Sequence, residues 1–491
     1  MKDFTKKKIA IFISEIMWTT HLGTGLEIIQ NHLDAGDHVQ QFVCNSFLHV
    51  CDQNTGASPG ICSLCMHKRK KAVSLLSNKI ELVEINFPDI NYDYLNPEMN
   101  LNGLKKIEHG RFDVGMAAAS SLISLTRDAS ISVHANFALL NELINKSCGL
   151  YDFFIAKLTQ EKQDIVYVFN GRLIYDRALL RACEHLKINY RIFDGAYDVN
   201  KYSLIENAML HDIKDFEKRA SDLWEKSEKK DEEKYKLGET FYLNSRYGSS
   251  KMRAFYAEKQ QDELLPESWN DSLNNIVCFL SSEDEFAAIG DQWVMDLYTN
   301  QVDGLNKISA SLQDYPATRL FIRIHPNSFN TNPSFIHSIY SLASEKVFII
   351  PPDSPISSYT LMLKSDKVLT FGSSVGIEAS FWSKPSINLG KSFYMNMGVA
   401  YNPRTHDEVI QMIEDKNLQA LPKENTIKYG FYLLEDGFNY KYYHPINNGV
   451  GYFKGVDLHK YNQTWMTRMR IKIRALTPPL LINIYRKIRH N

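Results

Sequence analysis

Residues 367–379 read Lys-Val-Leu-Thr-Phe-Gly-Ser-Ser-Val-Gly-Ile-Glu-Ala and hold the clearest sign of the fold. The apolar run Lys367–Phe371 predicts a buried strand, and the residues after it predict the start of a helix. Between the two lies a Gly-Ser-Ser-x-Gly turn, Gly372–Gly376. Such a turn presents free backbone N–H groups, two hydroxyls and the positive end of the helix dipole. These features suit a phosphate group.

A second segment, Arg323-Ile324-His325-Pro326, follows another apolar run earlier in the chain. An arginine and a histidine at the end of a neighbouring strand would add charge-assisted donors to the same phosphate. Each short motif also occurs for structural reasons, but their pairing favours binding of a phosphate-bearing ligand. The residues predicted to bind it are Arg323, His325, Gly372, Ser373, Ser374 and Gly376.

Short apolar strands alternate with helix-sized segments along the whole chain. This alternation is typical of parallel sheets covered by helices on both faces, so we expect an α/β protein with two doubly wound domains. The strands are expected at residues 9–14, 38–44, 80–85, 165–169 and 190–193 in the first half, and at 276–280, 320–324, 347–350, 367–371 and 386–389 in the second.

The domain boundary is expected between residues 260 and 261. Residues 1–260 would form the first domain and residues 261–457 the second. Within the first, residues 206–236 are dense in charges of both signs and predict a long exposed helix.

Length and composition narrow the class of protein. A chain of 491 residues is too long for one ordinary core. Hydrophobic residues at 44% and charged residues at 23% are typical of a soluble globular protein, and a net charge of −1 gives no basic field for nucleic acid. The apolar run Ile9–Ile13 is too short for a signal peptide, and no stretch is long enough to span a membrane. We therefore expect a cytoplasmic protein with reduced thiols.

Candidate residues of the first half also follow strands, where ligands of open α/β sheets bind. His21 and Gly23 follow the first strand, Arg172 the fourth, and Asp194 the fifth. Gly23 and Gly25 lack the third glycine of a dinucleotide-binding fingerprint. The predicted acceptor-binding residues are His21, Gly23 and Arg172. Arg172 could instead pair with Asp194 or Asp176, and Asp194 could simply belong to a turn.

The chain resembles the bacterial capsule and surface-polysaccharide biosynthesis glycosyltransferases, whose GT-B fold has two Rossmann-like domains facing each other across a cleft. The resemblance rests on Arg323–Asn327, on Asp366–Ala379 with Lys384–Ile387, and on Phe169–Arg172 followed by Phe193–Ala196. The chain is also similar to bacterial sialyltransferases and Kdo transferases, which hold the donor phosphate with a His-Pro and a Ser-Ser motif.

The resemblance implies a nucleotide-sugar donor in the second domain and a glycan or lipid-linked glycan acceptor in the first. His325, Ser373 and Ser374 would contact the donor phosphate, and Glu378 would bind a ribose hydroxyl. Glu378 could instead be an acid in the first turn of the helix that interacts with the helix dipole. Asp194 would be the general base, although Phe193 replaces the first acid of the family's acidic-acidic-Gly motif. Catalysis would be electrostatic, with His325 stabilising the departing phosphate, and would require no cofactor.

Four of the seven cysteines form a C-x6-C-x10-C-x2-C pattern at Cys44, Cys51, Cys62 and Cys65. In a cytoplasmic protein such a cluster favours a metal site over disulfides, and four thiolates suit structural zinc. Reduced, unliganded thiols and an iron–sulfur cluster remain alternatives.

The C-terminal tail, residues 458–491, interleaves basic and apolar residues. Such a tail indicates attachment to an anionic membrane surface, at about 1 kcal/mol per basic residue. This favours a peripheral location on the cytoplasmic face of the inner membrane. A final helix that packs back onto the first domain is the alternative.

Competing functions remain open at this point. A polyol-phosphate transferase of the teichoic-acid type, a sugar-nucleotide epimerase and a non-catalytic polysaccharide assembly protein all fit the sheet pattern. A redox or iron–sulfur enzyme would account for the cysteines alone.

Overall fold

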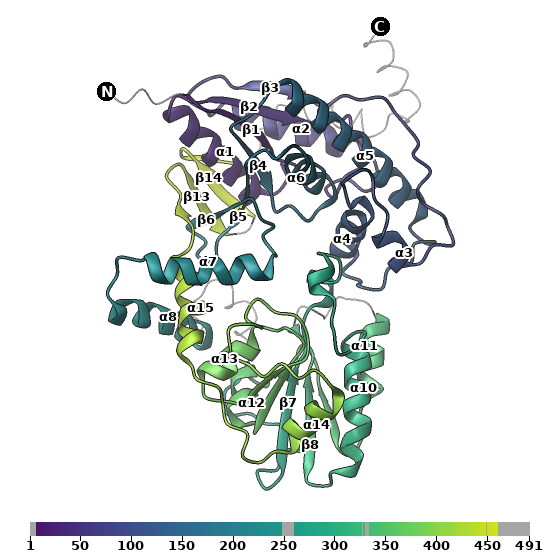
Figure 1. Cartoon of the computed structure of the whole chain (residues 1–491), viewed down its shortest axis with the longest axis vertical. Coiled ribbons are helices and arrows are strands. Elements are labelled where there is room, and N and C mark those ends of the chain that lie inside the picture. Colours follow the sequence, from purple (N-terminus) through teal and green to yellow (C-terminus); the bar gives the residue numbers. More distant parts are fainter. Residues whose placement is uncertain (1–5, 248–259, 327, 329–332, 448, 460–491) are drawn as a thin grey trace. The chain divides into compact units, whose positions relative to one another are not determined.

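The computed structural model describes residues 6–247, 260–326, 328, 333–447 and 449–459 (Figure 1). By internal contacts the chain divides into two compact units. Unit 1 comprises Met1–Leu125, Ser130–Leu210 and Gly437–Asn491, and unit 2 comprises Thr126–Ala129 and His211–Asp436. The predicted tail, from residue 460 onward, lies outside the described residues.

Unit 1 is built on a seven-stranded sheet of order β12-β6-β5-β4-β1-β2-β3. Strands β1 to β5 are mutually parallel, while β6 pairs antiparallel with β5 and β12 antiparallel with β6. The bounds are β1 Lys8–Phe12, β2 His38–Val43, β3 Glu81–Glu84, β4 Ile165–Phe169, β5 Tyr190–Gly195, β6 Lys201–Glu206 and β12 Phe438–Asn439.

Helices cover both faces of this sheet. On one face Ile9, Ile11 and Tyr167 pack with Leu22 and Leu26 of α1. On the other face the ring of Phe154, from α5, packs against the rings of Phe12 and Phe42. The helices of unit 1 are α1 Thr19–Asp34, α2 Pro59–Val73, α3 Leu101–Lys105, α4 Val114–Thr126, α5 Phe137–Gln160 and α6 Ile174–Leu186.

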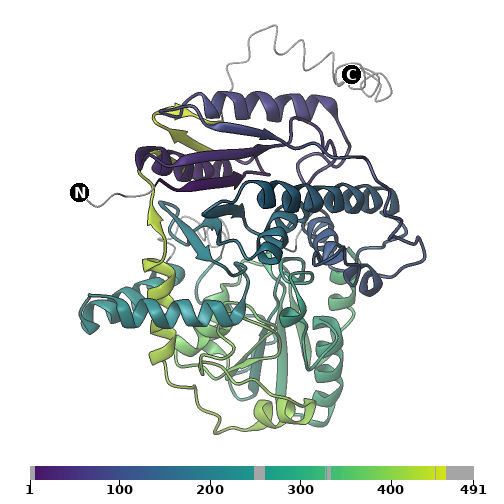
Figure 2. The same ribbon diagram turned by 45° about the horizontal axis from the view of Figure 1, so that its top comes forward.

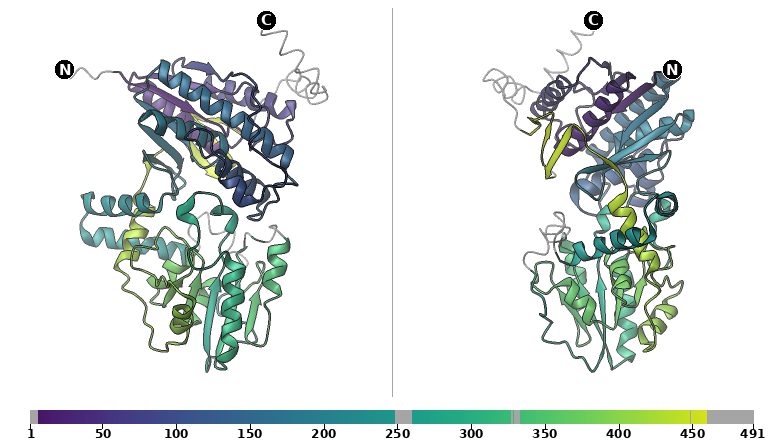
Figure 3. Two further views of the ribbon diagram at one scale, coloured as in Figure 1. Left: turned by 45° about the vertical axis from the view of Figure 1, so that its right-hand side comes forward. Right: turned by 90° about the vertical axis from the view of Figure 1, so that its left-hand side faces the viewer.

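A small three-stranded sheet from the end of the described chain packs on α1. Its strands are β13 Tyr443–Asn447, β14 Val450–Phe453 and β15 Val456–Asp457. Figure 3 shows these yellow strands beside the purple helix α1. Tyr443 and Phe453 are fully buried in the core of unit 1, so residues far apart in sequence share one hydrophobic core.

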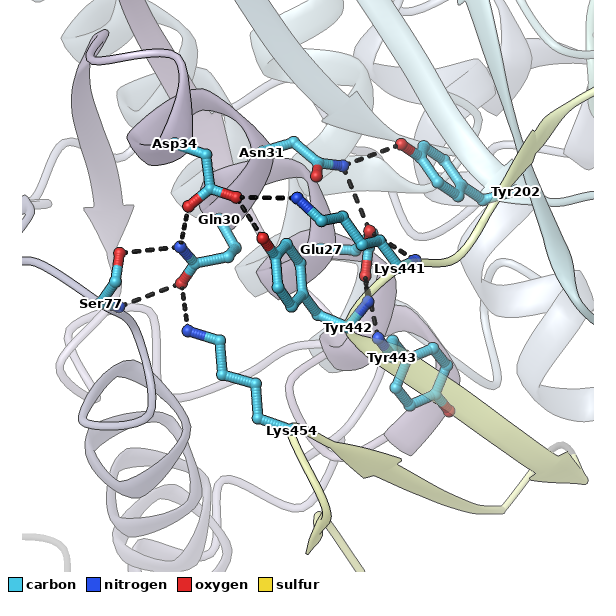
Figure 4. Close-up of polar contacts among 10 residues, drawn as sticks. All are labelled: Glu27, Gln30, Asn31, Asp34, Ser77, Tyr202, Lys441, Tyr442, Tyr443 and Lys454. Atoms are coloured by element: carbon cyan, nitrogen blue, oxygen red, sulfur yellow. Dashed lines mark hydrogen bonds and ion pairs between the residues drawn. The ribbon is translucent and has the colours of Figure 1, made fainter.

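Glu27 of α1 holds this returning segment in place (Figure 4). Its carboxylate is fully buried and accepts hydrogen bonds from the backbone N–H groups of Lys441 (3.0 Å), Tyr442 (2.8 Å) and Tyr443 (2.9 Å). Asn31 donates a fourth, at 3.2 Å. A single side chain, Glu27, therefore fixes the start of the returning segment against α1.

Unit 2 contains a five-stranded parallel sheet of order β11-β10-β7-β8-β9. Its strands are β7 Asn274–Phe279, β8 Thr318–Arg323, β9 Val347–Ile350, β10 Lys367–Thr370 and β11 Ser386–Asn388. Alternate residues of each strand face opposite sides. Ile276 and Cys278 pack with α10 (Gln301–Ser311) and α14 (His406–Glu414), whereas Val277 and Phe279 pack with α12 (Ser358–Lys364) and α13 (Val375–Phe381). Figure 2 shows helices on both sides of this sheet. The sheet is therefore doubly wound.

The helices of unit 2 surround this sheet and extend beyond it. The longer ones are α7 Ile213–Lys226, α8 Asp231–Arg246, α10 Gln301–Ser311, α11 Pro333–Tyr340, α12 Ser358–Lys364, α13 Val375–Phe381, α14 His406–Glu414 and α15 Glu424–Glu435, and short 3-10 turns lie at Glu283–Glu285, Asp291–Trp293 and Leu312–Asp314.

The division into units does not follow the boundary expected between residues 260 and 261. Helices α7 and α8 pack against α15 and so belong to unit 2, while the chain after Asp436 returns to unit 1. The charged segment 206–236 is also not one helix: residues 227–230 separate α7 from α8. Phe216 of α7 packs against Tyr429 and Tyr432 of α15. One face of this highly charged segment is therefore held against α15 by aromatic contacts.

All of the predicted strands are present, and the predicted α/β class with two doubly wound domains is confirmed. Among the described residues, no helix combines the length and the apolar character needed to cross a membrane.

Candidate functional site

The strand order of unit 2 places a topological switch point between β7 and β10. From β7 the chain moves one way to β8 and β9, and then to the other side for β10 and β11. The loops that leave the carboxyl ends of β7 and β10 therefore diverge, and open α/β sheets bind their ligands at such a point.

The loop after β7 contacts both segments that were predicted to bind phosphate. Ser281, after β7, donates from its hydroxyl to the carbonyl of Phe371, after β10, at 3.2 Å. Ser282 lies 3.4 Å from Nδ1 of His325, which follows β8. The Ser-Ser turn and the histidine thus approach one another through the loop after β7.

The Gly-Ser-Ser-x-Gly turn has little room for other residues. Gly372 has a φ of 101°, and a Cβ at this position would lie 2.1 Å from the carbonyl oxygen of Lys391. A Cβ on Gly376 would lie 2.3 Å from the hydroxyl of Tyr394, which donates to the carbonyl of Ser373 at 2.6 Å. These contacts fix the backbone path of the turn.

Glu378 has a different position from the one implied by the resemblance. Its side chain is 2% exposed, and its carboxylate accepts hydrogen bonds from the hydroxyls of Ser374 (3.3 Å) and Tyr359. The carboxylate therefore stabilises the first turn of α13 from within the protein, because a buried anion near a helix start is favoured by the helix dipole. A ribose hydroxyl would have to displace one of these partners.

Arg323 is also placed differently from its prediction as a phosphate ligand. The side chain is 2% exposed and donates to the backbone carbonyls of Pro351 and Ser354, in the loop after β9. Burial lowers the pKa of the guanidinium to about 10. Arg323 thus connects the end of β8 to the neighbouring loop, and its contact with a phosphate stays a prediction.

Unit 1 repeats the switch point between β1 and β4, because β2 and β3 lie on one side and β5 on the other. His21, in the first turn of α1, lies here with its ring 4.1 Å from that of Phe169, measured between centroids. Its Nδ1 atom is 2.7 Å from Oε2 of Glu15, in the loop after β1. Sequence reasoning missed Glu15, although its position directly after a strand was a usable signal.

Asp194 lies at the end of β5, beside this pair. Oδ2 of Asp194 accepts a hydrogen bond from Asn170 at 2.7 Å, and Oδ1 accepts one from the N–H of Gly195 at 2.7 Å. Burial raises the pKa of Asp194, while the nearby His21 and these two hydrogen bonds lower it. Its role as general base stays a prediction.

Two further residues, Gly23 and Arg172, were predicted to bind the acceptor. A Cβ on Gly23 would lie 2.3 Å from the ring of Tyr443, so this glycine allows close packing on α1. Its part in acceptor binding stays a prediction. Arg172 donates a hydrogen bond to the hydroxyl of Ser124 at 3.1 Å.

Asp176, in the first turn of α6, is a buried acid near the same strand ends. It is 1% exposed; Oδ2 accepts from Ser14 at 2.9 Å, and Oδ1 has no hydrogen-bond partner among the described residues. Burial raises the pKa of Asp176 well above its usual range, and the charges of Glu15, Asp52 and Asp194 raise it further.

Asp176→Asn is expected to remove a pH-dependent cost in stability. The folded state holds the proton on Asp176 more tightly than the unfolded state does, so the free energy of unfolding should fall as pH rises above about 4. The variant lacks this pH dependence, so at high pH its free energy of unfolding should rise relative to that of the wild type. Urea denaturation of both proteins across pH checks this, and parallel curves would contradict it.

The four clustered cysteines line one cavity of about 70 Å³ in unit 1 together with apolar residues and Tyr175. However, the part of the chain that the structure describes contains no group of three or more His, Cys, Asp or Glu side chains placed to bind a metal ion. Burial raises the pKa of the thiols of Cys44, Cys51 and Cys65, which favours the protonated form. Structural zinc at these cysteines and its alternatives therefore stay predictions.

Residues 296–432 match the family model described as "Capsule polysaccharide biosynthesis protein". This part of the chain therefore carries a capsule polysaccharide biosynthesis domain, as the resemblance implied. The matched residues lie within unit 2 and include His325 and the whole Gly372–Gly376 turn. No curated protein matches the chain.

Several solved structures are distantly similar. The β-Kdo 2,4-transferase of KpsC from Thermosulfurimonas dismutans has 13% identity and a TM-score of 0.36, over 55% of this chain and 80% of that one. The β-Kdo 2,7-transferase of the same protein has 12% identity and a TM-score of 0.35, over 66% and 88%. UDP-GlcNAc 2-epimerase from Neisseria meningitidis, bound to UDP-GlcNAc, has 12% identity and a TM-score of 0.30, over 87% and 98%.

Proposed function

We propose that the protein is a glycosyltransferase of the GT-B type that transfers a sugar from a nucleotide-sugar to a growing capsule polysaccharide. One observation supports the proposal above all: the capsule polysaccharide family match spans both segments that were predicted to bind phosphate. The contacts of Ser281 and Ser282 link these segments at a switch point.

The donor phosphate would lie against the hydroxyls of Ser373 and Ser374 and the imidazole of His325. When the bond between the sugar and the phosphate breaks, negative charge builds up on the departing phosphate oxygen. Donors already held in place around that oxygen lower the barrier, because they need not reorganise during the reaction. Arg323 and Glu378 would act indirectly, by fixing the loops that carry these groups.

The acceptor would bind at the strand ends of unit 1, where His21, Asn170 and Asp194 gather. Their hydroxyl-binding groups suit a sugar, since carboxylate, amide and imidazole side chains all exchange hydrogen bonds with hydroxyls.

The nucleotide can be identified by a thermal-shift screen against CMP, UDP, GDP, dTDP and CDP. A ligand that binds only the folded state raises the apparent melting temperature, so the nucleotide of the donor should stand out. Transfer is then followed by mass spectrometry with the matching nucleotide-sugar. A product that carries glycerol phosphate or ribitol phosphate would indicate a polyol-phosphate transferase, and turnover without acceptor an epimerase.

His325→Ala and the double variant Ser373→Ala/Ser374→Ala are each expected to lower kcat/KM by about 10²-fold, in line with the loss of an oxyanion donor. His337→Ala is the matched control, because His337 lies on α11 within the same family match but is exposed. If both test variants transfer sugar with the kcat/KM of the wild type, the assignment of the donor site is wrong.

A further inference from the structure

The cavity lined by the clustered cysteines is also a candidate binding site. It lies within unit 1 at the carboxyl ends of β1 and β2, because residues 14–16 and 44–46 form part of its wall. Ligands of open α/β sheets bind at such strand ends. The volume of about 70 Å³ is about half that of an engineered apolar cavity that binds benzene, so there is room for a group of about three or four non-hydrogen atoms.

Most of the cavity wall is apolar. Ile61, near the start of α2, is 37% exposed and also lines the cavity, so it marks the rim where the cavity meets solvent. An apolar group that leaves water for this wall loses no hydrogen bonds and is stabilised by the hydrophobic effect. The buried apolar side chains of the wall are Phe12, Ile13, Phe42 and Leu48.

Arg69, on α2, brings a polar donor to this wall. Its side chain is 5% exposed and donates from Nη2 to Oδ1 of Asn45. Nη1 is shielded from solvent and has no hydrogen-bond partner in the described ranges of the chain. A buried N–H group without an acceptor is unfavourable, and a hydrogen bond from a charged donor is strong. An oxygen atom of a ligand would therefore be held firmly at Nη1.

The side chains of Asp52 and Gln53 add acceptors to the same cavity. As far as the structure describes the chain, Oδ1 of Asp52 and Oε1 of Gln53 lack a donor. Burial raises the pKa of Asp52 to about 6, with a further contribution from the charge of Glu15, while a hydrogen bond from Ser121 lowers it. Glu15 also lines the cavity and lies 2.7 Å from His21, a predicted acceptor-binding residue. The cavity thus adjoins the proposed acceptor site within unit 1.

We propose that this cavity binds the N-acyl group of an acylated amino sugar in the acceptor, an inference that rests on the proposed glycosyltransferase function. The carbonyl oxygen of the acyl group accepts a hydrogen bond from Nη1 of Arg69, and its methyl group packs on the apolar wall. Hydroxyl groups of the same sugar donate to Asp52 and Gln53. An acetamido group has the size that the cavity admits, and it combines an apolar end with one strong acceptor.

Other common substituents of sugars suit the cavity less well. A hydroxyl group alone would leave the apolar wall uncovered. A free ammonium group would be repelled by the guanidinium of Arg69. A carboxylate would pair with Arg69, but it would share a small cavity with the acids Glu15 and Asp52.

The test measures the binding of methyl glycosides to the whole chain by calorimetry and by saturation-transfer NMR. The probes are N-acetylglucosamine, N-acetylgalactosamine and N-acetylmannosamine, each beside its free hexosamine and its parent hexose, and glucuronic acid. At least one N-acetylated sugar should bind about tenfold or more tightly than its two counterparts, in line with one hydrogen bond to a charged group. The strongest saturation should fall on its acetyl methyl protons.

Two variants locate this binding. Arg69→Met keeps the length of the side chain without its donors, so it should weaken binding of the acetylated sugar about tenfold and leave the parent hexose unaffected. Lys70→Met is its matched control, because Lys70 is the next residue of α2 and is exposed. Ile61→Trp should narrow the rim and lower the same affinity. Its control is Ile90→Trp, at an isoleucine of unit 1 that is 48% exposed and lies outside the cavity wall.

Urea denaturation verifies that each variant is folded. The position of Ile61 is partly exposed, so Ile61→Trp decides the question even if Arg69→Met does not fold. The inference is wrong if no acetylated sugar is preferred, if both Ile61→Trp and a folded Arg69→Met bind it like the wild type, or if glucuronic acid is the sugar that depends on Arg69.

The proposed function can fail separately. Binding of an acetylated sugar in the cavity without transfer from any nucleotide-sugar would refute the transferase but leave the binding site. Transfer to hexose acceptors that is as efficient as transfer to their N-acetylated counterparts would refute the role of the cavity in acceptor binding and leave the transferase.

Discussion

Glu27→Ala is expected to lower the free energy of unfolding by about 3–5 kcal/mol, the range seen when one partner of a buried charged contact is removed. The carboxylate accepts the backbone N–H groups of Lys441, Tyr442 and Tyr443. Without it these donors stay buried and lack their acceptor, and each unsatisfied donor costs about 1–3 kcal/mol. A cavity under the returning segment adds to the loss.

Chemical denaturation measures this change, and limited proteolysis locates it. Cleavage of the variant should rise first within residues 437–459, because this segment loses its contacts with α1. Asp34→Ala is the matched control on the same helix: Asp34 contacts Lys441 and Tyr442 as well, but through a more exposed side chain (Figure 4). It should cost much less. Equal losses in the two variants would contradict the role given to Glu27.

The parallel strands of both sheets could be predicted because each is a short run buried on both faces. Such runs are nearly continuous in apolar residues, as in Ile276–Phe279 and Leu320–Ile324. The same pattern predicted which loops lie at the carboxyl ends, and so placed His21, Asp194, His325 and Ser373 near the two switch points.

The return of the chain to unit 1 could not be predicted in the same way. Strand β12 has only two residues, both exposed, and β13 is only partly buried, so neither forms an apolar run. Their place depends on partners more than two hundred residues away, such as Tyr202 for Phe438 and Glu27 for Tyr443. A long-range contact of this kind leaves no local pattern.

The same limit explains which site residues were placed differently. A sequence pattern predicts where the backbone of a strand ends, but not which way a long side chain turns. Arg323 and Glu378 lie at the predicted strand and helix ends, yet one turns toward Pro351 and the other toward Tyr359. His21 was predicted at the acceptor site, but its carboxylate partner became visible only in the fold.

Asp113→Asn is expected to lower the free energy of unfolding by about 3–5 kcal/mol, because it leaves the buried Arg177 and the partly buried Arg181 without their counter-ion. Oδ1 of Asp113 accepts from Nε of Arg177 at 3.0 Å and from Nε of Arg181 at 2.9 Å. Arg177 is almost fully buried on α6, so it cannot turn to water when the charge is removed. The aspartate thus joins the start of α4 to the core of unit 1.

The contribution of Asp113 to stability should depend on pH. Burial alone would raise the pKa of Asp113, but hydrogen bonds and charges from Arg181 and Arg177 hold it well below its usual range. The stabilisation is complete above the unfolded-state pKa of about 3.9 and is lost as pH falls toward the lower folded-state value. The gap in stability between wild type and Asp113→Asn, measured by urea denaturation, should therefore narrow below about pH 4.

Asp222→Asn provides the control for Asp113. Asp222 also lies between two cations, Lys218 and Lys226, each at 3.0 Å, but this group is on the exposed face of α7. Water and salt screen such a surface pair, so its loss should change stability little at any pH. A gap for Asp113→Asn that stays constant down to pH 2, or that matches the Asp222 control, would show that the paired arginines do not depend on the aspartate's charge.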